Sequence, residues 1–223
     1  SWPGLALAVA AMVAFVARTP AKLILVDRWR SRWLSRSALA ARVEAVELVV
    51  LVALVAYAVS AGQPFWPPLV AAAPLIALEL WYDMRSRSRR LVPELAGSVG
   101  IGAIAAAIAL ADGADERLAW GLWIVVGARS LAAIPHMRVQ IQRTRSHPGS
   151  RWPSDGAQVA AVVAIGLAWV ADLVPLASVA AIIVLAVVEL VMVRLPPQRV
   201  VVIGIQQMIL GLVVVVATAA GVS

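Results

Sequence analysis

Positive charge alternates with apolar sequence along this chain, and this alternation constrains the fold more than any other feature. Except for Arg117 and Arg129, all of the 19 Lys and Arg residues fall within residues 18–42, 85–90, 138–151 and 194–199. These basic segments occupy every second gap between apolar stretches. Short loops rich in Lys and Arg stay on the cytoplasmic side of a membrane. The pattern predicts a multipass protein of the cell inner (plasma) membrane whose loops 18–42, 83–93, 137–155 and 194–199 are cytoplasmic.

Composition supports a membrane location. The chain is 62% hydrophobic and 14% charged, with a mean hydropathy of +0.91, whereas ordinary soluble domains are roughly 45–50% apolar. The arginines flank apolar stretches, so their partners are expected to be anionic membrane lipids and not nucleic acid. The sequence has no cysteine, which excludes disulfides, thiolate catalysis and Cys-bound zinc.

Eight apolar stretches are visible, and each approaches the roughly 20 residues that a helix needs to cross a bilayer. They lie at about 2–17, 43–61, 64–82, 94–111, 118–136, 156–174, 175–193 and 200–222. Backbone groups in lipid must be hydrogen-bonded internally, and the stretches lack the alternation of barrel strands. We therefore predict an all-α, polytopic transmembrane helical bundle that forms one integral membrane domain over residues 1–223. The prolines of 64–82 predict a kinked or partly unwound outer half.

The predicted orientation places residue 1 outside the cell. First residues normally remain cytoplasmic in an inner-membrane protein, so we expect a further N-terminal helix, giving nine crossings in the intact protein. A processed signal peptide is the alternative.

The first basic loop has its own pattern. Val26, Trp29 and Trp33 follow helical spacing, and arginines fill the positions between them. This spacing is typical of a helix that lies in the headgroup plane. Its role is either lipid anchoring alone or gating of an inward-facing cavity.

Ionisable residues within the apolar stretches are the main functional candidates, because each is costly in lipid without a partner or water. They are Glu47, Glu79, Arg129 and Glu189, and Gln206 and Gln207 lie at similar depth. Each of the four lies within about two helical turns of a basic loop. We predict a hydrated cavity that opens to the cytoplasm. Independent side chains that reach toward the membrane surface are the alternative.

Such a cavity suits an anionic ligand, such as an isoprenoid or lipid phosphate. The candidate ligand-binding residues are Arg18, Lys22, Tyr82, Arg129, Arg138, Arg143 and Gln206, and the candidate acids or bases are Glu47, Glu79 and Glu189.

Two carboxylate pairs have the spacing of a metal site. Glu44 and Glu47 are three residues apart, and Glu79 and Asp83 are four apart, so each pair projects from one helix face. Such pairs can hold Mg²⁺ together with ligand phosphates, but they are more often paired with neighbouring arginines. Neither histidine, His136 or His147, has a second histidine at ligand spacing.

Several motifs resemble those of the YwiC-like membrane protein family. One is LWYDMRSRSRRLVPELAG at 80–97, of which residues 82–97 are the most specific part, and others are residues 18–23, 129–138 and 202–207. Two positions depart from the family pattern. Gln207 replaces a usual Glu, and His136-Met137-Arg138 replaces a usual Tyr-Val-Arg.

The resemblance implies further properties. Family members usually begin with a His-Gly-x-Trp segment and an extra helix, which agrees with the nine crossings expected here. Their helix plan and inner loop are similar to UbiA-type intramembrane prenyltransferases, which use Mg²⁺ held by two Asp-rich loops. This chain has neither loop, so the fold-level similarity is a better guide than the activity. Two hypotheses remain, a prenyltransferase-like enzyme or binding protein for a lipid phosphate, and a transporter or accessory protein without catalysis.

Overall fold

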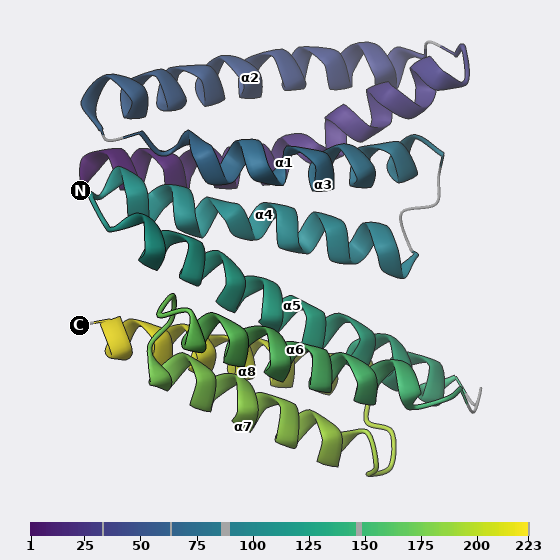
Figure 1. The fold of residues 1–223 in the computed structure, drawn as a ribbon. Helices are drawn as coiled ribbons and strands as arrows, with labels where there is room; N and C mark the ends of the chain where they lie inside the picture. The colour runs from purple at the N-terminus through teal and green to yellow at the C-terminus, as the bar shows by residue number, and fades with distance from the viewer. Residues whose placement is uncertain (33, 63, 86–89, 146–148, 223) are drawn as a thin grey trace. The chain divides into compact units, whose positions relative to one another are not determined.

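The computed structural model contains eight α-helices joined by short connections (Figure 1). It describes residues 1–32, 34–62, 64–85, 90–145 and 149–222, and the chain forms no strand within these ranges. The predicted all-α fold with eight helices is confirmed. Trp33, residues 86–89 of the motif at 80–97, and residues 146–148 of the basic segment, which include His147, lie outside the described residues.

Residues Ser1–Ala119 form one compact unit, called unit 1 here. It contains α1 (Trp2–Trp29), α2 (Ser35–Ala61), α3 (Trp66–Met84) and α4 (Leu91–Ala111). Helix α1 packs along α2, α3 packs along α4, and α1 also contacts both α3 and α4. Small residues spaced three or four apart, including Ala96, Gly100, Ala103 and Ala107, are buried on α4. Small side chains let helices in a membrane approach closely.

Residues Trp120–Ser223 form a second compact unit, unit 2. Its helices are α5 (Glu116–Thr144), which begins just before the unit boundary, α6 (Trp152–Val170), α7 (Leu176–Met192) and α8 (Val200–Val222). All four contribute to one apolar core, which includes Ala132, Ile165, Ile182 and Val214. The single domain over 1–223 stays a prediction.

Six helices of the described chain are long and apolar enough to cross a membrane, namely α1, α2, α4, α5, α6 and α8. Helix α7 is apolar but has only 17 residues. Helix α3 is not among these six, and it carries prolines together with Glu79 and Asp83. Large apolar side chains such as Val49 on α2 and Met208 on α8 are exposed, as expected for helices that face lipid.

Helix α1 differs from the sequence-based expectation. Residues 18–29, predicted as part of a loop with an in-plane helix, continue α1 without interruption. Pro20 lies inside the helix, where its missing N–H leaves the carbonyl of Val16 without a donor. Figure 1 shows α1 changing direction along its length. At about 1.5 Å per residue, the 28 residues exceed the span of a ~30 Å hydrocarbon core, so the end of α1 reaches the membrane surface.

The prolines of α3 also act differently from the prediction. Pro67 and Pro68 lie in the first turn, where a missing N–H costs nothing because first-turn N–H groups have no partner within the helix. Pro74 lies inside the helix, which remains assigned throughout Trp66–Met84. The expected unwinding is therefore not found within this range.

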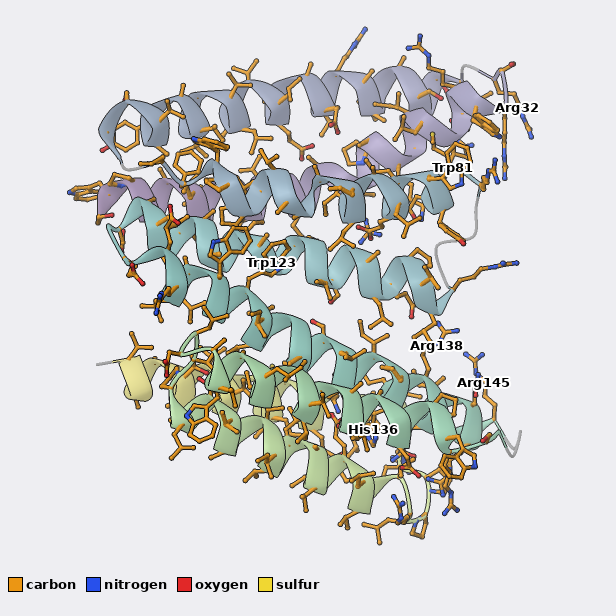
Figure 2. All side chains as sticks on the ribbon, in the orientation of Figure 1. Arg32, Trp81, Trp123, His136, Arg138 and Arg145 are labelled. Atoms are coloured by element: carbon orange, nitrogen blue, oxygen red, sulfur yellow. The ribbon has the colours of Figure 1, made fainter. Side chains whose placement is uncertain are left out.

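The basic loops of each unit lie at one end of that unit. In unit 1, Arg32 of the α1–α2 connection and Trp81 near the end of α3 lie at the same end (Figure 2). In unit 2, Arg194 after α7 pairs with Asp155 at the start of α6, with 3.3 Å between Nη1 and Oδ1. Within each unit, this arrangement agrees with the predicted alternation of basic and non-basic loops.

Candidate functional site

Unit 1 contains a cluster of four ionisable side chains, called the ion cluster here: Arg18, Lys22, Glu79 and Asp83. The first two are one helical turn apart on α1, and the other two are one turn apart on α3. Lys22 Nζ lies 3.1 Å from Asp83 Oδ1, and Arg18 Nη2 lies 3.3 Å from Asp83 Oδ2. Arg18 also pairs with Glu79. Two basic and two acidic side chains therefore meet where α1 crosses α3.

Gly97 of α4 makes room for this cluster. A Cβ atom at this position would overlap the carboxylate of Glu79. Because glycine has no side chain, α4 approaches α3 closely enough to cover Glu79, which is buried. Gly97 is also the last residue of the most specific motif in the sequence, so packing accounts for its presence there.

The charges of the ion cluster are unevenly exposed. The Asp83 side chain is 1% exposed, whereas those of Arg18 and Lys22 are 38% and 37% exposed. A buried carboxylate is stable only with a partner, and removing one partner of such a pair typically costs 3–5 kcal/mol. The two basic groups therefore neutralise the buried acids while keeping part of their surface accessible.

A pocket of about 370 Å³ lies beside the ion cluster, at the end of α1. It is lined by Thr19, Lys22, Leu23, Val26, Asp27, Arg30 and Arg36. Asp27 accepts hydrogen bonds from Arg36 Nη2 at 3.1 Å and from Ser37 Oγ at 2.7 Å, which joins the start of α2 to the end of α1. With three basic side chains and one carboxylate, the lining has an excess of positive charge.

Unit 2 contains a separate buried polar network, to which each of its four helices contributes one residue. Glu189 of α7 is fully buried, at 0% exposure. Its Oε2 accepts a hydrogen bond from Gln158 Nε2 at 2.6 Å, and its Oε1 accepts one from Gln207 Nε2 at 2.7 Å. Gln158 Nε2 also donates to the carbonyl oxygen of Ala132, at 3.1 Å.

Arg129 of α5 joins this network through Gln207. Its Nη2 lies 2.7 Å from the backbone oxygen of Gln207 and 3.5 Å from the side-chain Oε1. The Gln207 amide thus accepts from the guanidinium on one side and donates to the Glu189 carboxylate on the other. Gly211, one turn further along α8, leaves space for the guanidinium, since a Cβ there would lie 3.0 Å from Arg129 Nη2.

The remaining predicted residues have varied surroundings. Arg143 donates to the backbone oxygens of Val193, at 2.6 Å, and Leu195, at 3.0 Å, just after α7. Gln206 donates to Gln198 Oε1 at 2.6 Å. The others, Glu47, Tyr82 and Arg138, are half-buried on α2, α3 and α5.

The structure groups the predicted residues by unit. Arg18 and Lys22 meet Glu79 and Asp83 in unit 1, while Arg129 meets Glu189 and Gln207 in unit 2. The single shared cavity stays a prediction.

Sequence reasoning missed Arg30 and Arg36 of the pocket and Gln158 of the network. Gln158 carried a usable signal, because it is a polar residue inside the apolar run of α6. The two arginines carried none, since they are two of several in the same basic segment.

These features define a multipass helical membrane protein. Residues 1–109 match the model of a family described as YwiC-like protein. No curated protein and no solved structure matches the chain. The matched range contains α1, α2, α3 and most of α4, and therefore holds the whole ion cluster and pocket. The motifs at 129–138 and 202–207, and the polar network of unit 2, lie beyond it.

Proposed function

We propose that the protein binds a phosphate-bearing lipid at the pocket of unit 1, on the cytoplasmic side of the bacterial inner membrane. The main support for this proposal is the pocket, because Lys22, Arg30 and Arg36 line one space at the end of a helix long and apolar enough to cross the membrane. Charge-assisted hydrogen bonds to phosphate are strong, and the planar guanidinium of arginine can make two of them at once.

The apolar part of the lining fits an amphiphile better than free phosphate. Leu23 and Val26 contribute hydrocarbon surface beside the basic groups. An acyl or isoprenoid chain can contact this surface and continue into the bilayer along α1. Isoprenoid diphosphates and anionic glycerolipids share this chemistry, so both serve as test ligands.

The resemblance to UbiA-type enzymes that the sequence predicts concerns only the arrangement of helices. In those enzymes carboxylates hold Mg²⁺, whereas here Glu79 and Asp83 are paired with Arg18 and Lys22. The basic side chains occupy the positions a metal ion would take, so these carboxylates do not fit a Mg²⁺ site. Binding or movement of the lipid, without chemical conversion, is what the pocket supports.

Ligand titration tests this proposal. The purified protein, in nanodiscs of phosphatidylcholine, would be titrated with farnesyl diphosphate and separately with phosphatidic acid. Arg30→Gln should weaken binding of the preferred ligand about tenfold, since a hydrogen bond to a charged group contributes about 1.5–3 kcal/mol. Arg28→Gln, on the same helix but outside the pocket lining, provides a control with equal loss of charge and should change affinity much less.

Three results would contradict the proposal. Equal effects of the two substitutions would indicate general attraction to a basic surface and not a pocket. Failure of both ligands to bind would reject the site. Conversion of labelled farnesyl diphosphate to a new product by the reconstituted protein would identify an enzyme.

A further inference from the structure

Unit 2 contains a line of buried polar side chains that the proposed lipid site does not use. It comprises Glu189, Gln158, Ser154, His136 and Gln140, none of which is more than 4% exposed. Buried polar groups inside membrane helices are costly and mark ion or proton pathways. Figure 2 shows His136 among the helices of this unit.

The line can be followed from Glu189 toward the basic end of the unit. Gln158 donates to Glu189, and Ser154 lies one turn before Gln158 on α6. Ser154 Oγ is 3.5 Å from His136 Nδ1 on α5. This contact continues the line from α6 to α5.

On α5 the line leads out of the helix bundle. Gln140 lies one turn beyond His136, and its Oε1 accepts from Arg143 Nη1 at 3.0 Å. Arg143 is only half-buried and lies beside the residues that follow α7. The polar line therefore joins the centre of the unit to its basic end.

One polar atom on this line, the side-chain oxygen of Gln158, has no hydrogen-bond partner among the described residues. Gln158 Nε2 is held by two acceptors, Ala132 O and Glu189 Oε2, which fixes the orientation of the amide. Its Oε1 is buried. Buried acceptors normally have a donor, and a water molecule between polar groups supplies one in many proteins. The unpaired oxygen can therefore accept a hydrogen bond from a water molecule on this line.

We propose that Glu189 is a proton-binding site and that protons reach it along this line from the basic end of unit 2. A hydronium ion at that end would give up one proton and become water, and the carboxylate of Glu189 would take up one proton and become a neutral carboxylic acid. The side-chain amides keep their own N–H protons, and water beside them carries the proton. The proposal rests on unit 2 alone and is independent of the lipid site.

The surroundings of Glu189 favour a proton over a metal ion. Both carboxylate oxygens already accept from amide N–H groups, which occupy the positions that a metal ion would take. No group of three or more His, Cys, Asp or Glu side chains able to hold a metal ion occurs within the described ranges. The charged group that faces this site from α5 is Arg129, and α6 and α8 present the neutral amides of Gln158 and Gln207.

Infrared difference spectroscopy on the full chain in lipid bilayers tests the proposal. We expect a carbonyl band of a protonated carboxylic acid whose amplitude depends on pH. The band should be lost in Glu189→Gln, a substitution that keeps size and polarity, and retained in Asp172→Asn, a control outside the line. Gln158→Leu should shift the band frequency, because Glu189 Oε2 loses a donor.

Proton access is tested by the rate at which this band responds to transfer into D₂O. Ser154→Ala, which removes only the hydroxyl, should slow the response at least several-fold. Ser178→Ala changes a buried serine on α7 outside the line and should leave the rate unchanged.

A band unaffected by Glu189→Gln, or no band at any pH, would overturn the assignment of Glu189 as the proton-binding site. An unchanged rate in Ser154→Ala would overturn the pathway. A band that responds to NaCl but not to choline chloride at constant pH would show a sodium site instead.

Discussion

At the scale of single residues, Gln207 is the most informative side chain in the molecule. It lies between a half-buried cation, Arg129, and a buried carboxylate, Glu189, and its amide has a group suited to each. A carboxylate in place of this amide would repel Glu189, unless one of the two carried a proton. The amide avoids that repulsion.

Gln207→Leu is expected to destabilise the protein by about 2 kcal/mol, because Glu189 loses one of its two amide donors, whereas Arg129 keeps the backbone oxygen of residue 207. The measurement is the free energy of unfolding in mixed micelles, followed by circular dichroism. The control is Gln206→Leu, which removes a bond to Gln198 near the membrane surface and should cost much less. Equal losses would show that the bridge has no special role.

At the scale of elements, α7 depends on a neighbouring helix at its C-terminal end. It has 17 residues, and the helix α5 completes its C-terminal end: Gln140 donates to Met192 O, and Arg143 donates to Val193 O and Leu195 O. The last carbonyl groups of a helix have no partner within it. Side chains from another helix here take the role of the cap.

Arg143→Leu should therefore lower the free energy of unfolding by about 2 kcal/mol, since two carbonyl groups lose a charged donor. Amide hydrogen exchange at residues 189–195 should become faster, while exchange in α6 should change little. Arg151→Leu removes an exposed arginine from the same basic segment and serves as the control. The capping role of Arg143 would be rejected if the amide hydrogens of α7 exchanged at the same rate in both variants.

The elements also show what could be predicted from sequence. The eight helices were predictable, because length and hydropathy determine them. The continuation of α1 through Pro20 was not, since proline usually marks a boundary. The partners of Arg129 were not predictable either. In a membrane, lipid-facing and protein-facing residues are both apolar, so the pattern along a helix does not reveal which face meets a neighbour.

At the scale of the whole molecule, the distribution of charge gives an orientation that can be measured directly. Each unit has its basic loops at one end, and the rule for positive charge predicts that both sets face the cytoplasm. The chain has no cysteine, so single introduced cysteines can be labelled without background.

Ser31→Cys and Ser150→Cys should react with a membrane-impermeant maleimide only after cells are permeabilised. Ser60→Cys and Glu116→Cys should react in intact cells. All four positions are exposed, so differences in labelling would report sidedness and not burial. Labelling of Ser31→Cys and Ser150→Cys from opposite sides would reject the predicted topology.

The ion cluster has a consequence for biogenesis. Asp83 is nearly inaccessible once unit 1 has formed, and its charge is matched by side chains of a helix made more than 60 residues earlier. Because an unmatched buried carboxylate is costly, we expect α1 and α3 to dock against each other early in the assembly of unit 1. The pairing thereby links two helices that are separated in the sequence by the whole of α2.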